Sequence, residues 1–214
     1  MPRPTQPVRK PRRPYHHGNL RRALLDEALA TIHAEGGEGL TLREIGARVG
    51  VSRTALYRHF ADKRALLTAV ATEGFRMLRE QLVAAWEKGE RGDAAFHAMG
   101  VAYLRFAVDN PSHYRVMFGG SFDQLVHEPE LMVEAQGAFQ ALVEAVAALQ
   151  KDGLFLRDDP MLMATYVWAL VHGIATLAID AQLPEAVGID ELMRYSFERL
   201  RTGIRANTEN RRVR

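Results

Sequence analysis

Hydrophobic residues recur at helical spacing along most of the chain, and Gly and Pro residues divide it into segments. The first amphipathic segment runs from Asn19 to about Glu35 and places Leu24, Ala28 and Ile32 on one side. Later segments of the same kind cover about 62–88, 93–109, 111–118, 128–151, 160–180 and 190–205. No stretch alternates in the way a strand would. The pattern predicts an all-α fold of about nine helices, with a small three-helix head followed by a helical bundle.

The segment 41–63, TLREIGARVGVSRTALYRHFADK, predicts two short helices held at a fixed angle. Thr41 followed by Glu44 is a capping box that opens the first of them. Gly46 offers a bare surface on which a second helix can cross closely. Gly50 stands where the chain must turn sharply and a Cβ would be costly.

Ser52 is expected to cap the second short helix, which turns Leu56 and Phe60 inward. Its outward positions carry hydrogen-bond donors and cations, namely Arg53, Thr54, Tyr57, Arg58 and His59. Such a face suits the major groove of DNA and its phosphate walls, so the pair is interpreted as a helix-turn-helix. The alternative is an ordinary helical hairpin with a solvated polar face.

The run from about Asn19 to Leu67 resembles the N-terminal domain of the TetR family of transcriptional regulators. That family's pattern is followed nearly throughout by the run LTLREIGARVGVSRTALYRHFADKRALL. The exception is Gly46, which stands where the family usually carries Ala. The resemblance implies that Tyr57, His59 and Thr41 bind phosphates, and that Lys63 does so from the start of the next helix. The full set of expected DNA-binding residues is Thr41, Ser52, Arg53, Thr54, Tyr57, Arg58, His59 and Lys63.

Two of these residues also have a physical argument of their own. Arg53 lies near the start of the reading helix, where its guanidinium can bind the O6 and N7 atoms of a guanine. A phosphate or solvent contact is the equally open alternative. Lys63 lies in the first turn of a helix, where exposed N–H groups and the helix dipole already favour an anion. Thr54 is expected to contact a thymine methyl group or a phosphate.

The net charge of +2 hides an uneven distribution. Residues 1–65 hold 13 Lys and Arg against 6 Asp and Glu, whereas residues 66–200 hold 10 against 19. A basic front and an acidic body indicate a polyanionic partner at one end only. We expect a basic flexible arm at 1–18, a DNA-binding domain at 19–65, a ligand-binding and dimerisation domain at 66–205, and a polar tail at 206–214.

The segment between Pro160 and Asp180 contains nineteen residues without a formal charge and has to be weighed as a membrane span. Its flanks are acidic, and Thr165, His172 and Gly173 interrupt it, so a helix buried on all sides is expected and no membrane contact. This helix and the last one are assigned the contact between two copies of the chain. The alternative is that their apolar surface belongs to the core of a single copy.

Two segments of the body resemble the TetR subgroup named for a Trp, a His and a Gly in its C-terminal domain. They are NPSHYRVMF (110–118) and WALVHG (168–173). Aromatic and Met residues in the body, 66–205, are expected to line a cavity for a small hydrophobic effector, with the ordinary core as the alternative. The candidates are Phe75, Phe96, Met99, Tyr103, Phe106, Tyr114, Phe118, Phe139, Trp168 and His172.

Other classes of function lack support in the sequence. Cys is absent, the eight His show no metal-binding spacing, and GGSFD around Ser121 lacks the second Gly of a nucleophile elbow. We therefore expect no enzyme activity, no metal and no cofactor. The sequence predicts a cytoplasmic, ligand-responsive repressor that binds a palindromic operator as a homodimer. A non-specific or architectural DNA-binding protein is the alternative.

Overall fold

The computed structural model describes residues 20–37, 39–89, 91–120, 125 and 127–204. Within these ranges the chain forms nine α-helices, which confirms the predicted all-α fold. The predicted arm at 1–18 and tail at 206–214 lie outside the described residues. The helices are α1 (Leu20–Glu35), α2 (Leu42–Val49), α3 (Arg53–His59), α4 (Lys63–Lys88), α5 (Asp93–Asp109), α6 (Pro111–Phe118), α7 (Pro129–Lys151), α8 (Pro160–Ile179) and α9 (Ile189–Ile204).

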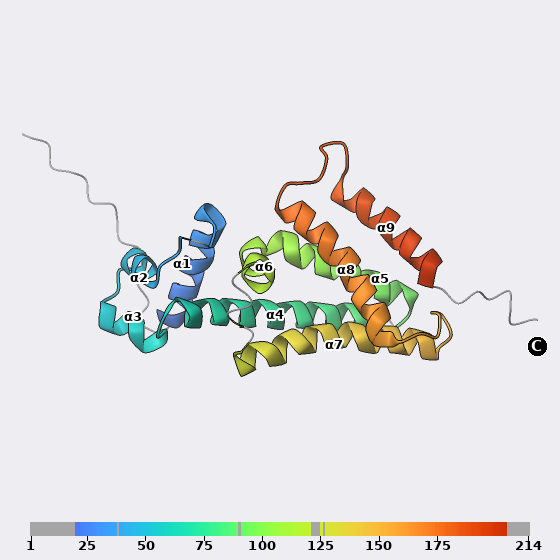
Figure 1. The fold of residues 1–214 in the computed structure, drawn as a ribbon, viewed down its shortest axis with the longest axis horizontal. Coiled ribbons are helices and arrows are strands. Elements are labelled where there is room, and N and C mark those ends of the chain that lie inside the picture. The colour runs from blue at the N-terminus through green and yellow to red at the C-terminus, as the bar shows by residue number, and fades with distance from the viewer. Residues whose placement is uncertain (1–19, 38, 90, 121–124, 126, 205–214) are drawn as a thin grey trace, which may run out of the picture.

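The long helix α4 connects the two parts of the molecule (Figure 1). Its first turn packs under the head formed by α1, α2 and α3, and its remainder runs through the body against α5, α6 and α7. α8 crosses the body against α5 and α7, and α9 forms the outermost layer on α8. Helix α4 therefore contributes to the packing of both parts.

Side-chain caps set the starts of α2, α3 and α4, as the sequence predicts. Thr41, Ser52 and Asp62 all have extended backbone angles, and each accepts the backbone N–H three residues later, at 3.3, 3.2 and 2.8 Å. Each cap satisfies one of the N–H groups that the first turn of a helix leaves without a partner. Helix α3, the predicted reading helix, thus begins at a position that its own sequence defines.

Two glycines permit the sharp crossing of α2 and α3. Gly50 ends α2 in the left-handed region, with φ of 79°, and its N–H bonds back to Gly46 and Ala47. Gly46 is buried, and a Cβ at that position would lie 2.8 Å from Cδ2 of Leu56 on α3. The missing side chain of Gly46 gives Leu56 room in this close contact, and Gly50 adopts the positive φ of the turn without the strain that a Cβ would bring.

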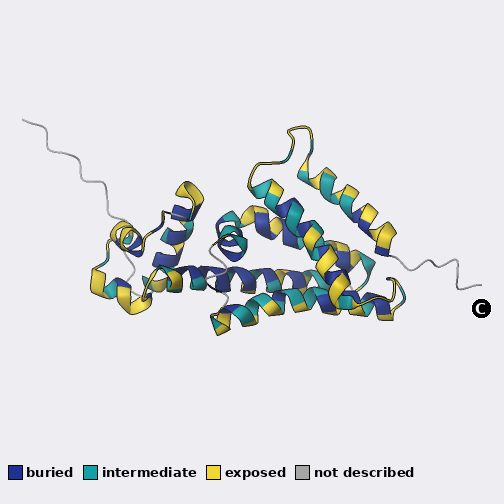
Figure 2. Cartoon of the chain, in the orientation of Figure 1, coloured by how far each residue is buried: buried dark blue, intermediate teal, exposed yellow. Residues whose placement is uncertain are grey.

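The apolar face of α4 is buried along its length, in a core that continues from the head into the body (Figure 2). Leu24, Ile45 and Leu56 fill the head, and Phe75 and Leu78 on α4 lie in the body. Because one continuous core joins the two parts, they are packed together and are not merely linked.

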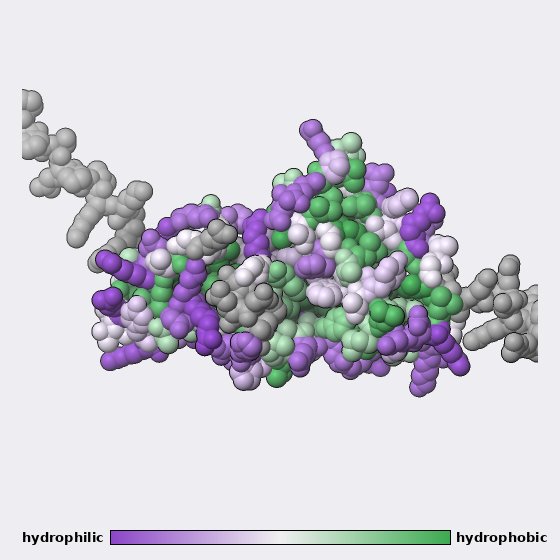
Figure 3. Space-filling model, in the orientation of Figure 1, coloured by the Kyte–Doolittle hydropathy of each residue, from purple (hydrophilic) through white to green (hydrophobic). Residues whose placement is uncertain are grey.

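The prediction that helix 160–180 is buried on all sides is wrong. Met163, Val167 and Val171 face the core, but Leu162 and Tyr166 are 64% and 58% exposed. By length and composition α8 is apolar enough to cross a membrane, yet its inner face packs on α5 and α7 of the body. The helix carries no charge because it has two apolar faces, and only one of them is covered by described residues of this chain. Hydrophobic side chains gather over α8 and α9 in Figure 3.

Candidate DNA interface and ligand cavity

The outward face of α3 matches the predicted reading surface. Tyr57 is 44% exposed, whereas Leu56 and Phe60 are 3% exposed. The other outward residues are also exposed, namely Ser52, Arg53, Thr54, Arg58 and His59. Within the part of the chain that the structure describes, no ion pair engages Arg53 or Arg58. Both guanidinium groups are therefore available to a ligand in front of α3.

Thr41 and Lys63 are more constrained than the residues of α3. The Thr41 hydroxyl donates to the carboxylate of Glu44 at 2.8 Å while it caps α2. Lys63 is half-buried, and its Nζ donates to the carbonyl of Gly37 at 3.2 Å, in the connection between α1 and α2. A phosphate contact by either residue has to compete with these bonds.

A cluster of charged and polar groups joins the head to the body. Arg22 on α1 donates to Glu73 on α4 at 2.7 Å, and Nε2 of His113 on α6 lies 3.1 Å from the same carboxylate. Ser112 on α6 donates to the carbonyl of Leu29 on α1 at 3.0 Å. The short helix α6 thus holds α1 directly and also through Glu73.

Burial and hydrogen bonding together set the ionisation of this cluster. It lowers the pKa of His113, against the opposing effect of the Glu73 carboxylate. Burial alone would raise the pKa of Glu73, but its hydrogen bonds to Arg22 and His113 outweigh that effect and hold the pKa below the usual value. At neutral pH the cluster therefore contains a neutral imidazole, a carboxylate and a guanidinium.

We expect the protein to lose stability as the pH falls below the ordinary pKa of histidine, near 6.5. The folded pKa of His113 is lowered, so the unfolded chain takes up this proton first and unfolding becomes more favourable between the unfolded and folded values. His113→Gln should flatten this part of the curve of urea midpoint against pH. His33→Gln, at an exposed histidine of α1, is the matched control; equal flattening by both variants would contradict the assignment.

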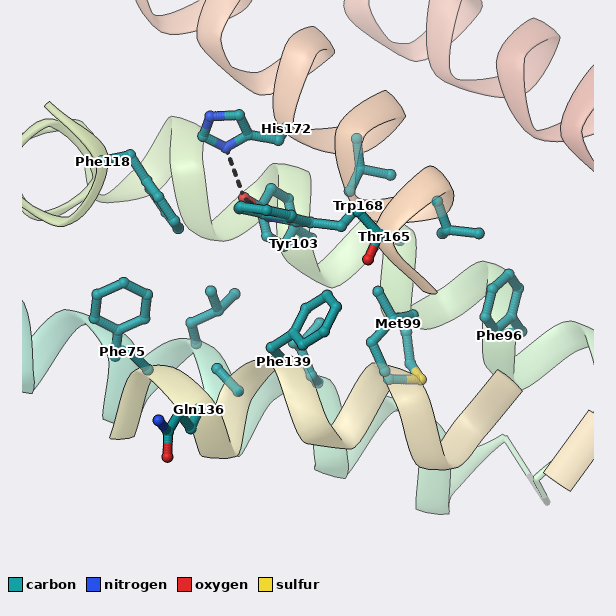
Figure 4. A pocket seen from close by; sticks show the side chains of 18 of the residues that line it. Phe75, Phe96, Met99, Tyr103, Phe118, Gln136, Phe139, Thr165, Trp168 and His172 are labelled. Atoms are coloured by element: carbon teal, nitrogen blue, oxygen red, sulfur yellow. Dashed lines mark hydrogen bonds between the residues drawn. The ribbon is translucent and has the colours of Figure 1, made fainter. Parts of the chain in front are cut away.

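A cavity of about 620 Å³ lies in the body between α4, α5, α7 and α8 (Figure 4). Its described wall is apolar apart from a few uncharged polar groups. Gln136 on α7 and Thr165 on α8 are exposed and also line it, so the cavity opens to solvent between these two helices. A small uncharged molecule is the kind of ligand that such a wall accepts.

Eight of the ten residues predicted to line a cavity lie in this wall. They are Phe75, Phe96, Met99, Tyr103, Phe118, Phe139, Trp168 and His172. Phe106 is 1% exposed and belongs to the core, and Tyr114 lies behind the wall, where it bonds to Tyr103. Leu78 and Leu82 also line the cavity and were not predicted, although their helical spacing from Phe75 could have indicated them. Phe197 was not predicted either, because no local pattern indicates that it lines the cavity.

Four polar side chains form a connected network at the back of the cavity. The indole N–H of Trp168 donates to the hydroxyl of Tyr103 at 3.2 Å, and this hydroxyl lies 3.0 Å from that of Tyr114. The Tyr114 hydroxyl lies 2.6 Å from Nδ1 of His172. Burial lowers the pKa of His172 and raises that of Tyr114 to about 12, so at neutral pH the imidazole is neutral and the Tyr114 hydroxyl keeps its proton. The network ties α5, α6 and α8 together without any charge.

Comparison with known proteins gives matches over both parts of the chain. The family model for bacterial regulatory proteins of the tetR family matches residues 24–70, and the model for a tetracyclin repressor-like C-terminal domain matches residues 96–200. The uncharacterized HTH-type transcriptional regulator YobS of Bacillus subtilis (strain 168) is 22% identical over 194 residues, covering 90% of this chain and 96% of that protein.

Solved structures with the same fold extend the likeness to nearly the whole chain. A protein with unknown function from Rhodococcus sp. RHA1 is 33% identical, with a TM-score of 0.78 over 92% of this chain and 100% of that one. The SmeT–triclosan complex is 21% identical, with a TM-score of 0.65 over 87% of this chain and 92% of that one.

The fold, with the exposed face of α3, is that of a helix-turn-helix transcriptional regulator with a helical body. The two family models together cover most of the chain, and it belongs to the TetR family of bacterial regulatory proteins. This is a family of DNA-binding regulators and not of enzymes. In the described ranges, no group of three or more His, Asp or Glu side chains is arranged to hold a metal ion.

Proposed function

We propose that this protein is a cytoplasmic repressor that binds a palindromic operator as a homodimer and leaves it when a small hydrophobic effector enters the cavity. The observation that carries the DNA-binding part is the exposed cationic face of α3 on a rigid head. The eight DNA-binding residues of the sequence analysis are retained in this proposal, with Arg53 as the base-reading residue and Lys63 as a phosphate contact.

The uncovered face of α8 supports the homodimer. This helix has four exposed apolar residues, namely Met161, Leu162, Tyr166 and Leu177, and α9 has the exposed Tyr195. Soluble monomers rarely leave so much apolar surface in one place, and a second copy with the same surface would cover it by two-fold symmetry. Two heads related in this way would read successive major grooves about 34 Å apart, or a multiple of that distance.

Helix α6 supports a physical connection between the cavity and the head. Phe118 at one end of α6 lines the cavity, while Ser112 at the other end bonds to α1. Between them, Met117 packs so closely on α4 that a side chain at Gly74 would displace it. A ligand that shifts Phe118 would therefore change how α4 and α1 lie on the body, and with them the spacing of the two heads. SmeT, solved with triclosan, shows a small molecule in complex with a protein of this fold.

DNA selected from a random pool by the purified protein should contain an inverted repeat. Arg53→Ala is expected to remove the preference at one base pair of each half-site, worth about 1–3 kcal/mol of discrimination. Lys63→Ala is the matched control, since loss of a phosphate contact weakens binding to every sequence and lowers the salt slope by about 0.9. If Arg53→Ala lowered the affinity for all sequences equally, Arg53 would contact a phosphate and not a base.

The same selection separates the proposed repressor from a non-specific DNA-binding protein. A non-specific protein would return no common sequence, and random competitor DNA would displace the labelled site as effectively as unlabelled site DNA does. The acidic body, with 19 Asp and Glu against 10 Lys and Arg in residues 66–200, favours the specific repressor, because DNA-coating proteins gain from positive charge over most of their surface.

A further inference from the structure

A second cavity of about 460 Å³ lies next to the first, between α5 and the C-terminal half of α9. Phe96 on α5 and Phe197 on α9 line both cavities. These two rings therefore form the wall between them. In Figure 4, Phe96 lies at the opposite end of the first cavity from Phe75 and Phe118, so the wall closes one end of an elongated space.

The two rings of this wall are held differently. Phe96 packs edge to face on Phe155, with ring centroids 5.0 Å apart and an interplanar angle of 88°. Phe197 lies over Gly100 of α5, where a methyl group would overlap the Cζ atom of Phe197. The ring centroids of Phe197 and His97 are 4.7 Å apart. Among the described lining residues, Phe197 is the single contribution of α9 to the first cavity.

The two spaces differ in polarity on either side of the wall. The described lining of the first cavity carries no charged side chain. The second has an apolar floor that includes Phe155 and Leu200, with charged residues at its edge, among them Asp93, Arg194 and Arg201. An apolar ligand that passed the wall would thus find further apolar surface before it reached charged groups and solvent.

We propose that Phe197 is a specificity-determining residue that sets the greatest length of ligand the first cavity accepts, and that the ligands are uncharged, elongated and apolar. This inference rests on the proposed function, because it takes the first cavity as the effector site. Each methylene that enters such a cavity raises affinity by about fourfold, the equivalent of about 0.8 kcal/mol. The gain should stop at the chain length that brings the ligand against Phe197.

The test uses the full chain and straight-chain primary alcohols from hexanol to hexadecanol. The protein has two tryptophans, so in a Trp86→Phe background the emission of Trp168, in the cavity wall, reports binding. In this background affinity should rise with each methylene and then level off. Phe197→Ala should extend the rise to longer alcohols, and Phe197→Leu, which keeps more of the buried contacts, should give an intermediate limit and a chain that still folds.

Leu142→Ala is the matched control, because Leu142 lines the first cavity but not the second. It should alter affinities without moving the chain length at which the rise ends. An unchanged limit in both Phe197 variants, or a limit moved as far by Leu142→Ala, would overturn the role of Phe197 and leave the effector cavity in place. If no alcohol changes the Trp168 emission or binds by calorimetry, the effector cavity itself is refuted, and this inference with it.

Discussion

Leu162→Arg is expected to give a folded monomer whose affinity for its operator is lower by about 100-fold or more, because two linked heads gain that much over one. Leu162 is 64% exposed on the outer face of α8, so a long cation there meets solvent in a single copy. In a dimer formed through α8 it would be buried without a partner, which is strongly unfavourable. Light scattering would measure the mass, and fluorescence anisotropy the affinity for selected DNA.

Val133→Arg on α7 is the matched control for this experiment. Val133 is 69% exposed, so an arginine is introduced at an apolar position of similar accessibility on a different helix. This variant should remain a dimer and keep its affinity for the operator. A dimer that survives Leu162→Arg, or is lost equally in both variants, would remove α8 from the interface.

Leu56→Ala is expected to lower the free energy of unfolding of the head by about 2–5 kcal/mol, the usual range for a buried Leu. Leu56 is 3% exposed, and Gly46 packs against it. Gly46→Ala alone should have a small effect, since Leu56 must shift its terminal methyl group while α2 gains up to about 1 kcal/mol from the replacement of a helical glycine. In the double variant, the new methyl group occupies part of the space that Leu56 leaves.

The double variant should therefore be more stable than the sum of the single changes predicts, by about 0.5–3 kcal/mol. Urea unfolding of all four proteins measures this difference. Gly46→Ala combined with Leu149→Ala is the control, because Leu149 is fully buried on α7 in the body and the two changes should add. Additive changes at Gly46 and Leu56 would show that the two residues do not set the crossing of α2 and α3.

The helix boundaries could be predicted closely because the signals that set them are local. Thr41, Ser52 and Asp62 each satisfy an N–H group three residues away, and this requires nothing from the rest of the fold. Gly50 was predicted for the same reason, since a left-handed residue is decided by its own backbone. The chemistry of the α3 surface also follows from a short stretch of sequence once its inward residues are known.

The burial of α8 could not be predicted in the same way. Its apolar residues surround the helix, so composition alone does not say which face meets the core and which stays uncovered. The structure resolves this by packing Met163, Val167 and Val171 against α5 and α7 and leaving Leu162 and Tyr166 outside.

The sequence by itself determined the nine helices, the caps that start the reading helix and the cationic face in front of it, because each depends on residues within one or two turns. Only the tertiary structure decided that Phe197 lines the cavity, that Tyr114 lies behind its wall and that α6 bonds to α1. These features arise where helices distant in sequence meet, and the geometry of such contacts depends on how the whole core is filled.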